Sequence, residues 1–315
     1  MIDNKKIAVV IPCFKVRAHI LQVIKGIGAE VDVIYVIDDC CPENSGDFVL
    51  KNILDQRVKV LFQKKNTGVG GAVIRGYKSA INDNIDIIVK IDGDGQMDSS
   101  LIVKFAHPLI HNLYDYTKGN RFYDISHLGN MPKIRLFGNS LLSFINKFSS
   151  GYWDIIDPTN GYTAINLKTL KIISLDKISN DYFFESDMLF RLSLLKSKIL
   201  DIPIRSVYKN EKSNLKIKSI IITFVYKHIK NFAKRFFYNY ILRDVTIGTF
   251  EFILGLLALF SGLIYGGIKW YVNSSSNLTT PTGTVVISAI LIILGVQLLL
   301  AFLNNDIQEN PNKKK

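Results

Sequence analysis

The residues of this 315-residue chain whose types and spacing best suit chemistry form the run Asp92-Gly93-Asp94-Gly95-Gln96. Two carboxylates one residue apart can converge on a divalent cation through oxygen ligands, and a glycine between them lets a ligand approach the backbone closely. A bound Mg²⁺ or Mn²⁺ would neutralise negative charge that develops on a diphosphate leaving group. Alone, an Asp-x-Asp run is more often an ordinary polar turn. Its meaning therefore depends on the elements that position it.

Four short apolar runs predict buried parallel strands, at residues 7–11, 31–37, 58–62 and 85–91. Segments of helical length and period lie between them, such as residues 18–27 and 70–81. Strands that alternate with helices predict a doubly wound sheet with right-handed crossovers. Ligands bind such sheets beyond the carboxyl ends of the strands, which is where Asp39 and Asp92 are expected. This position makes a metal or phosphate site at Asp92 much more credible than the turn alone.

Beyond residue 201 the composition becomes that of membrane-associated helices. Residues 215–240 mix apolar and basic side chains at helical spacing, as interfacial helices do. Residues 247–268 are apolar apart from Glu251, and residues 285–303 carry no charge. Each run reaches the roughly 20 residues that a bilayer span needs. Buried helices of a soluble protein are the alternative, but two such runs with the uncharged residues 272–283 between them favour a transmembrane hairpin.

The net charge of +12 predicts an acidic partner, which could be nucleic acid, anionic lipid or a phosphorylated substrate. Between residues 209 and 243, nine Lys or Arg residues stand against one acid, directly before the first apolar run. A basic segment beside a span indicates lipid headgroups. Because no zinc-finger spacing or other nucleic-acid module is visible, we expect no nucleic-acid partner.

The charge distribution also predicts where the protein resides. Basic residues precede the first apolar run and end the chain, whereas residues 272–283 between the runs include none, so both ends should be cytoplasmic. The three cysteines suggest no disulfide framework, which fits a reducing compartment. The N-terminus leads directly into a strand-like run, so we expect no signal peptide. The prediction is a multi-pass protein of the cell (inner) membrane with a cytoplasmic catalytic domain.

From residue 6 to about residue 215 the sequence resembles the family-two glycosyltransferases of the GT-A fold. The family motif Ile-Pro-x-(Tyr/Phe)-Asn-Glu corresponds to residues 11–16, Val-Asp-Asp-x-Ser-x-Asp to residues 37–43, and Asp-x-Asp-x-Gln to residues 92–96. Within that family it is similar to the dolichol-phosphate mannose synthases and the bacterial polyprenyl-phosphate hexosyltransferases. Lys15 and Val16 depart from the usual Asn-Glu, which leaves the base and sugar preference open.

The resemblance implies a role for each matching position. The metal, Mg²⁺ or Mn²⁺, would be held by Asp92, Asp94 and Gln96. The residues that carry the chemistry would be Asp94, Asp157 and Arg121. The acceptor phosphate would be bound by Arg135 and Asn139. The nucleotide sugar would be bound by Pro12, Phe14, Ile37, Asp39, Asp92, Gly93, Arg121, Arg205 and Lys212. Guanidinium groups bind phosphate in bidentate fashion, which supports the arginines, although a surface arginine is the alternative for each.

Two further segments, residues 157–162 and 184–187, resemble family segments near the sugar. Asp157 would bind sugar hydroxyls or orient the acceptor, and it need not be a general base because a phosphate monoester is already anionic at neutral pH. Glu185 and Asp187 could instead cap a helix. The Gln-x-x-Arg-Trp run of processive family members is missing from this sequence, which favours transfer of a single sugar.

These inferences predict a GT-A mixed α/β sheet at residues 1–208, basic amphipathic juxtamembrane helices at 209–246, two transmembrane helices at 247–305 and a cytoplasmic tail at 306–315. The predicted reaction is inverting, metal-dependent transfer of one hexose from a UDP- or GDP-sugar to polyprenyl (undecaprenyl or dolichyl) phosphate. One alternative is transfer to a lipid-linked glycan or protein. Another is a non-catalytic membrane scaffold that binds nucleotide sugar. Homo-oligomer formation is left open.

Overall fold

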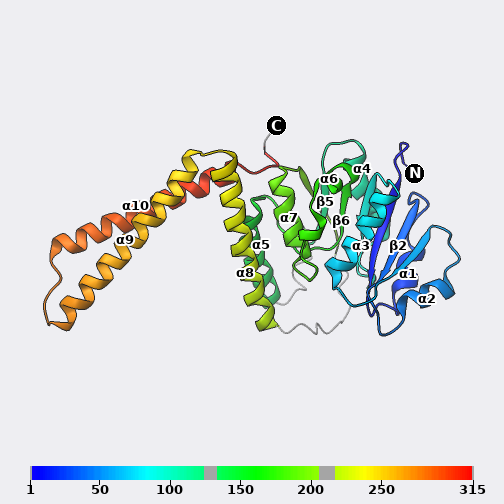
Figure 1. The fold of residues 1–315 in the computed structure, drawn as a ribbon, viewed down its shortest axis with the longest axis horizontal. Coiled ribbons are helices and arrows are strands. Elements are labelled where there is room, and N and C mark those ends of the chain that lie inside the picture. Colours follow the sequence, from blue (N-terminus) through cyan, green and yellow to red (C-terminus); the bar gives the residue numbers. More distant parts are fainter. Residues whose placement is uncertain (1, 124–132, 206–216, 314–315) are drawn as a thin grey trace. The chain divides into compact units, whose positions relative to one another are not determined.

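The structure is a computed structural model that describes residues 2–123, 133–205 and 217–313, without the side chains of residues 133–136 and 217–221. A seven-stranded mixed sheet with the order β3-β2-β1-β4-β6-β5-β7 organises its first part (Figure 1). The strands are β1 (Ile7–Cys13), β2 (Val33–Asp38), β3 (Val58–Phe62), β4 (Ile87–Lys90), β5 (Tyr116–Asn120), β6 (Thr163–Asn166) and β7 (Ile199–Pro203). The mixed α/β sheet expected from the sequence is confirmed.

The pairing of the strands brings several strand ends to one edge of the sheet. Pro12 on β1 pairs with Ile37 on β2 in parallel register. Strand β6 is antiparallel to both of its neighbours, and its first residue, Thr163, pairs with Lys90 of β4 and Lys118 of β5. Consequently, the segments that follow β1, β2, β4 and β5 and the segment that precedes β6 lie along the same edge.

The four strands expected in the first half of the chain all form, with limits shifted by at most two residues. Strand β1 continues past the apolar run because Pro12 and Cys13 still pair with β2. Strand β2 begins only at Val33, since the Asp32 side chain instead accepts a hydrogen bond from the backbone N–H of Ile7 at 2.8 Å. The apolar runs therefore located the strands, and backbone pairing set their ends.

Helices cover both faces of the sheet, because successive apolar side chains of β1 point to opposite faces and both sets are buried. Ala8 and Val10 enter one core, whereas Ile7, Val9 and Ile11 enter the other. The first core also receives side chains from α3 (Val69–Asn82), α6 (Leu167–Ile172), α7 (Phe184–Leu194) and the short 3₁₀ turn η3 (Leu175–Lys177). The second receives them from α1 (Ile20–Lys25), α2 (Ser45–Asn52), α4 (Ile102–Ile110) and the 3₁₀ turn η1 (Ser99–Leu101).

Two longer helices are α5 (Lys133–Ser150) and α8 (Ile217–Phe236). Buried polar contacts join α8 to the sheet domain. His228 Nδ1 lies 2.7 Å from the Ser149 hydroxyl, and the Asn231 amide donates to Asp187 Oδ1 at 3.1 Å. Burial lowers the pKa of His228 to about 4, so this imidazole is neutral at physiological pH. The first part of α8 thus belongs to the sheet domain.

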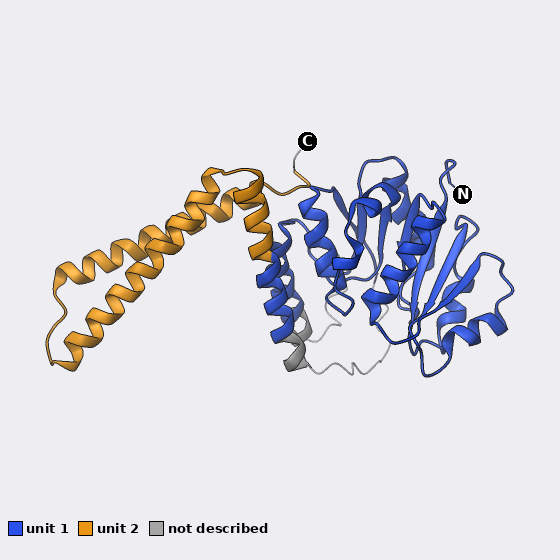
Figure 2. Cartoon of the chain, in the orientation of Figure 1, with its two compact units in different colours: residues 1–231 blue, residues 232–315 orange. Residues whose placement is uncertain are grey.

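The chain divides into two compact units, residues 1–231 and residues 232–315 (Figure 2). The border lies within α8, inside the segment expected to be juxtamembrane. The second unit contains the π-helical turn η4 (Phe237–Arg243) and the long helices α9 (Ile247–Ser275) and α10 (Thr282–Gln308). Helix α9 extends beyond the expected residue 268, so the link between the two helices is shorter than the sequence suggested.

Helix α10 continues into the segment expected to be a tail. A buried ion pair accompanies this extension, in which Arg235 Nη1 lies 2.7 Å from Asp306 Oδ1. The Tyr240 hydroxyl donates to the same oxygen at 2.7 Å. These contacts hold the last turns of α10 against the segment that precedes α9, within the second unit.

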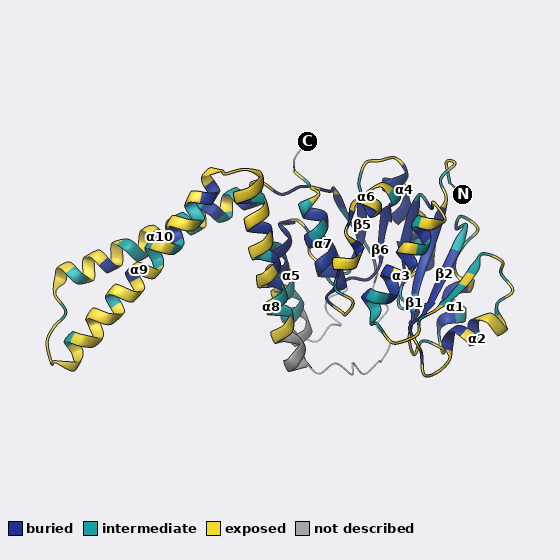
Figure 3. Ribbon diagram, viewed as in Figure 1, coloured by how far each residue is buried: buried dark blue, intermediate teal, exposed yellow. Residues whose placement is uncertain are grey.

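Helices α9 and α10 pack closely along their length while their outer surfaces remain apolar and exposed (Figure 3). A Cβ on Gly262 would lie 2.9 Å from Ile292 Cγ1, and one on Gly295 would lie 2.6 Å from the backbone nitrogen of Leu259. Glycines at such positions let helices approach, as is common in membranes. The most apolar windows of α9 and α10 are only 22% and 17% buried, which disfavours the soluble-helix alternative. Both helices are long and apolar enough to cross a membrane.

Candidate active site

The turn after β4 presents three oxygen-bearing side chains at the strand edge. Asp92, Asp94 and Gln96 are all partly exposed. Asp94 Oδ1 accepts a hydrogen bond from the backbone N–H of Gln96 at 3.0 Å. Gly95 has a φ of +73°, a conformation that favours glycine. The hydrogen bond and the glycine conformation define this turn, which carries the three predicted metal ligands; their role in binding a metal stays a prediction.

This set of residues fits a divalent cation of the Mg²⁺ or Mn²⁺ type. The part of the chain that the structure describes contains no group of three His, Cys, Asp or Glu side chains able to hold a metal by themselves. Mg²⁺ commonly binds one or two carboxylates and takes its other ligands from substrate phosphates and water. Asp92, Asp94 and Gln96 supply oxygen atoms of that kind. A diphosphate would complete such a site.

Asp92 is also bound by Lys90, a residue that the sequence analysis did not select. The Nζ of Lys90, a buried residue, donates to Asp92 Oδ1 at 2.8 Å and to Glu185 Oε1 at 3.0 Å. Burial alone would lower the pKa of Lys90, but the two carboxylates outweigh it and raise that pKa above its usual value. The signal in the sequence was a lysine that ends an otherwise apolar strand. Such a lysine is rarely buried unless it is paired.

The two acidic residues of segment 184–187, Glu185 and Asp187, contact different parts of the structure. Helix α7 has Phe183 as its N-cap residue, so neither Glu185 nor Asp187 caps it in the usual way. Glu185 reaches Lys90, as described above. Asp187 Oδ2 accepts from the backbone N–H of Ser179 at 2.9 Å, and its other oxygen binds α8. Glu185 thus belongs to the candidate site, whereas Asp187 joins helices.

Arg121 and Asp157, both predicted to carry chemistry, form a bidentate pair. Arg121 Nε lies 2.7 Å from Asp157 Oδ2, and Nη2 lies 2.8 Å from Oδ1. Asn160 Nδ2 donates to Oδ2 at 3.1 Å. The carboxylate is 1% exposed and the guanidinium 24% exposed. Burial would raise the pKa of Asp157, but Arg121, Lys118 and Asn160 together hold it below its usual value. The pair fixes the guanidinium at the end of β5.

Asp39 is buried and accepts four hydrogen bonds. Its Oδ1 accepts from Gln63 Nε2 at 3.0 Å, from the Thr67 backbone N–H at 2.8 Å and from the Thr67 hydroxyl at 2.9 Å. Its Oδ2 accepts from the Gly68 backbone N–H at 2.8 Å. A carboxylate offers about four such positions. In this structure Asp39 therefore organises the loop after β3, and the sequence did not indicate Gln63 or Thr67.

The other predicted nucleotide-binding residues of the first strands occupy different environments. Phe14 is 39% exposed just after β1, where its ring could contact a ligand. Ile37 is fully buried in the core, and Pro12 pairs with it. A Cβ on Gly93 would lie 3.1 Å from Val16 Cγ2, so the missing side chain makes room for that residue. The nucleotide roles of these positions stay predictions.

For three basic residues selected in the sequence analysis, the structure does not describe a contact with the candidate site. Arg205 follows β7 and is exposed. Lys212 lies outside the described residues. Arg135 lies on α5, but its side chain is also outside the described part. Their predicted contacts with the diphosphate or the acceptor phosphate therefore stay predictions.

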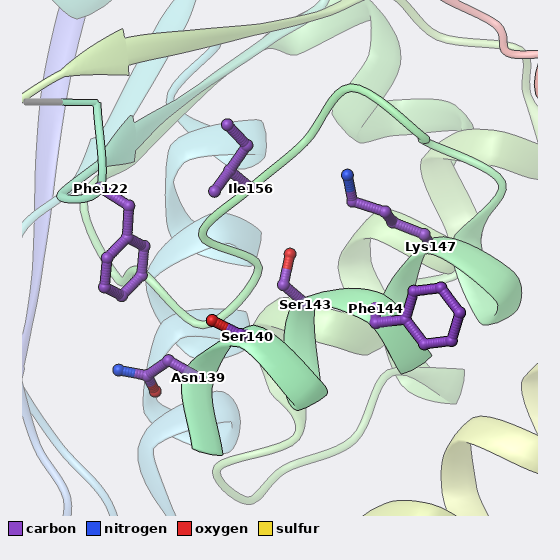
Figure 4. A pocket seen from close by; sticks show the side chains of 7 residues that line it. All are labelled: Phe122, Asn139, Ser140, Ser143, Phe144, Lys147 and Ile156. Atoms are coloured by element: carbon purple, nitrogen blue, oxygen red, sulfur yellow. The ribbon is translucent and has the colours of Figure 1, made fainter. Parts of the chain in front are cut away.

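Asn139, the second predicted acceptor residue, lines a pocket of about 340 Å³ beside α5 (Figure 4). The pocket is lined by Phe122, Asn139, Ser140, Ser143, Phe144, Lys147 and Ile156. Lys147 Nζ donates to the Trp153 carbonyl at 2.7 Å, and burial lowers the pKa of this lysine. Phe122 and Ile156 are the sequence neighbours of Arg121 and Asp157. The pocket is therefore lined in part by residues that adjoin the bidentate pair in the sequence.

Comparison with known proteins identifies the family. The model of glycosyl transferase family 2 matches residues 8–172, more than half of the chain. A UDP-N-acetylglucosamine–dolichyl-phosphate N-acetylglucosaminyltransferase of Methanococcus voltae is 28% identical over 220 residues, covering 65% of this chain and 87% of the relative. An undecaprenyl-phosphate mannosyltransferase of Micrococcus luteus is 31% identical over 180 residues, covering 56% and 72%.

A solved structure shares the fold. Glucosyl-3-phosphoglycerate synthase of Mycobacterium tuberculosis, crystallised with Mn²⁺, UDP and its product, superposes with a TM-score of 0.54. The alignment covers 74% of this chain and 80% of the synthase at 17% identity, which supports the fold alone. Taken with the strand-edge geometry, the family match settles the assignment: the chain belongs to glycosyl transferase family 2 and is a glycosyltransferase.

Proposed function

We propose that this glycosyltransferase transfers one hexose from a UDP- or GDP-sugar to polyprenyl (undecaprenyl or dolichyl) phosphate, with inversion and with Mg²⁺ or Mn²⁺. One observation carries the proposal: Phe122 and Ile156, which line the pocket that contains Asn139, are the sequence neighbours of Arg121 and Asp157. The proposal therefore places the donor site and the acceptor site next to each other. The relatives named for transfer to dolichyl and undecaprenyl phosphate support the acceptor class.

The donor occupies the strand edge from Phe14 to Asp94 in this proposal. The metal, held by Asp92, Asp94 and Gln96, supplies neutralising charge for the leaving diphosphate. Arg121, fixed by Asp157, directs N–H groups toward the same diphosphate. The buried contacts of Asp157 keep that guanidinium in place without reorganisation during the reaction.

The acceptor phosphate provides the nucleophile. One of its oxygens forms a bond to the anomeric carbon while the bond from that carbon to the diphosphate oxygen breaks, and the diphosphate leaves with the electron pair. A phosphate monoester is largely ionised at neutral pH, so no side chain has to remove a proton. Attack opposite the leaving group inverts the anomeric centre.

The pocket beside α5 suits the phosphate end of a polyprenyl chain. The Asn139 amide and the Ser140 and Ser143 hydroxyls can donate hydrogen bonds to phosphate oxygens. Phe122 and Ile156 offer apolar surface to the first isoprene units. Along α5, three exposed apolar side chains lie about one turn apart, namely Phe137, Leu141 and Phe144, and Phe144 also lines the pocket. Such a row suits contact with lipid.

The second unit would anchor the enzyme where its acceptor resides. Helices α9 and α10 cross the cell membrane in this proposal, and the basic residues between 209 and 243, apart from the buried Arg235, contact anionic headgroups. The catalytic unit then lies on the cytoplasmic side.

A donor and acceptor screen tests the proposal. Purified full-length protein is incubated with radiolabelled UDP- and GDP-hexoses and polyprenyl phosphate, and label that enters chloroform is counted. One donor should give chloroform-soluble label that depends on polyprenyl phosphate. Label that appears only on an added lipid-linked glycan or protein would instead support the alternative acceptors.

A further inference from the structure

Lys90 is a charged group at the strand edge that the transfer reaction above does not use. Its side chain is 1% exposed, and its Nζ contacts Asp92 Oδ1 at 2.8 Å and Glu185 Oε1 at 3.0 Å. The Asp92 side chain is 30% exposed, whereas that of Glu185 is 9% exposed. The Asp92 carboxylate therefore lies between a buried ammonium and the exposed edge where a metal would bind.

Gly161 leaves room for the contact between Lys90 and Asp92 because it has no side chain. A Cβ on Gly161 would lie 2.5 Å from Asp92 Oδ2 and 2.5 Å from Lys90 Nζ. Any larger residue there would push the ammonium and the carboxylate apart. Asp92 thus uses one oxygen for Lys90 and keeps the other beside Gly161, so it can offer a metal a single oxygen.

We propose that Lys90 is a positioning residue that makes metal binding depend on the donor. Its ammonium holds Asp92 Oδ1 and repels a divalent cation, so the metal binds weakly until a nucleoside diphosphate adds negative charge. Glu185, which contacts the same ammonium, offsets part of that repulsion. This inference rests on the metal site of the proposed function.

The distances indicate the size of the effect. A metal bound to Asp92 at about 2.1 Å would lie within about 6 Å of the Lys90 ammonium. A charge at about 4–6 Å changes the proton affinity of a carboxylate by about ten-fold to a thousand-fold, and its field acts on a metal in the same direction. Among the described residues, Glu185 forms its ion pair with the Lys90 ammonium and not with the metal ligands, so it would cancel the repulsion incompletely.

Two variants should shift metal affinity in opposite directions. Glu185→Gln keeps the Lys90 ammonium but removes the carboxylate that partly offsets its positive charge. The Mn²⁺ affinity without nucleotide should therefore fall about ten-fold. The double variant Lys90→Met/Glu185→Gln removes both buried charges and should bind Mn²⁺ about ten-fold more tightly than the wild-type protein. Damage to the fold would weaken binding in both variants, so an increase in the double variant has no such explanation.

The experiment uses full-length protein in detergent and measures free Mn²⁺ by electron paramagnetic resonance, with and without UDP. Lys118→Met is a matched control, because Lys118 is a buried lysine on β5 whose Nζ donates to the backbone carbonyls of Gly119, at 3.2 Å, and Asp157, and not to Asp92. It should change Mn²⁺ affinity less than three-fold. UDP should raise Mn²⁺ affinity strongly in the wild-type protein and much less in the double variant.

The outcomes separate the inference from the proposed function. If the wild-type protein binds no Mn²⁺ even with UDP, the metal site itself is wrong and the inference falls with it. If UDP promotes Mn²⁺ binding but the Lys90 and Glu185 variants do not differ in direction, only the inference is wrong. Should the double variant fail to fold, as judged by thermal unfolding, unchanged Mn²⁺ affinity in Glu185→Gln would still overturn it.

Discussion

Arg121→Ala should destabilise the catalytic unit in a way that depends on pH. The substitution removes two charge-assisted hydrogen bonds, at 2.7 and 2.8 Å, and leaves the Asp157 carboxylate 1% exposed in the native protein. Breaking such a buried pair costs about 3–5 kcal/mol. Because Arg121 is itself 24% exposed, water can partly replace it, and we expect the lower end, about 3 kcal/mol. For a unit of this size that is a fall in Tm of about 6–12 °C.

The sign of the pH dependence follows from the lowered pKa of Asp157. In the wild-type protein the Arg121–Asp157 pair contributes fully to the free energy of unfolding above the ordinary carboxyl pKa of about 3.9. That contribution is lost only at lower pH. In Arg121→Ala, burial dominates and raises the pKa of Asp157, so the carboxyl can accept a proton in mild acid. The variant's deficit in Tm relative to the wild-type protein should therefore be smaller at pH 5 than at pH 8.

Thermal unfolding of the wild-type protein and Arg121→Ala in detergent at pH 5 and pH 8 tests this pH dependence. Titrating groups that both proteins share contribute equally to each Tm and cancel in the difference between them. Arg121→Ala/Asp157→Asn serves as the matched variant, because it removes the orphaned charge and should recover about 1–2 kcal/mol at pH 8. A deficit that is equal at pH 5 and pH 8, together with no recovery in the double variant, would refute the reasoning.

Three further predictions concern the metal, the acceptor and the membrane. Asp94→Asn should abolish transfer without lowering the Tm, and EDTA should inactivate the wild-type enzyme until Mg²⁺ or Mn²⁺ is restored; activity that persists in EDTA would exclude the metal. Asn139→Ala should raise the apparent KM for polyprenyl phosphate about ten-fold, while calorimetry without acceptor should find donor affinity unchanged; an equal loss of donor affinity would place Asn139 in the donor site. A cysteine at Ser275 should react with an impermeant reagent from the outer side of intact membranes, whereas exposed Cys40 should react only after permeabilisation, and labelling of both from one side would contradict the hairpin.

Much of the fold could be predicted because its signals are local. Runs of β-branched residues located β1 to β4, and two long apolar runs located α9 and α10. The Asp92 turn was recognisable from its own residues and from the strand before it. The lengths of α9 and α10 were underestimated, because the final turns of α10 lie against a partner, Arg235, that is 71 residues away in the sequence.

The pairings within the candidate site were not predictable in this way. Arg121 and Asp157 were each selected, but their mutual contact spans 36 residues and depends on how β5 and β6 pair. Lys90 and Glu185 lie 95 residues apart, and only the packing of α7 on the sheet joins them. The local sequence gave no indication that the buried carboxylate of Asp39 binds the loop after β3.

The most direct test of the account is the identity of the lipid product. Wild-type protein and Asp94→Asn are each incubated with the donor selected by the screen and one defined polyprenyl phosphate, and the extracted lipid is analysed by mass spectrometry. We expect the wild-type reaction alone to add the mass of one hexose residue to polyprenyl phosphate. Unchanged lipid phosphate in a reaction that consumes the donor would contradict it.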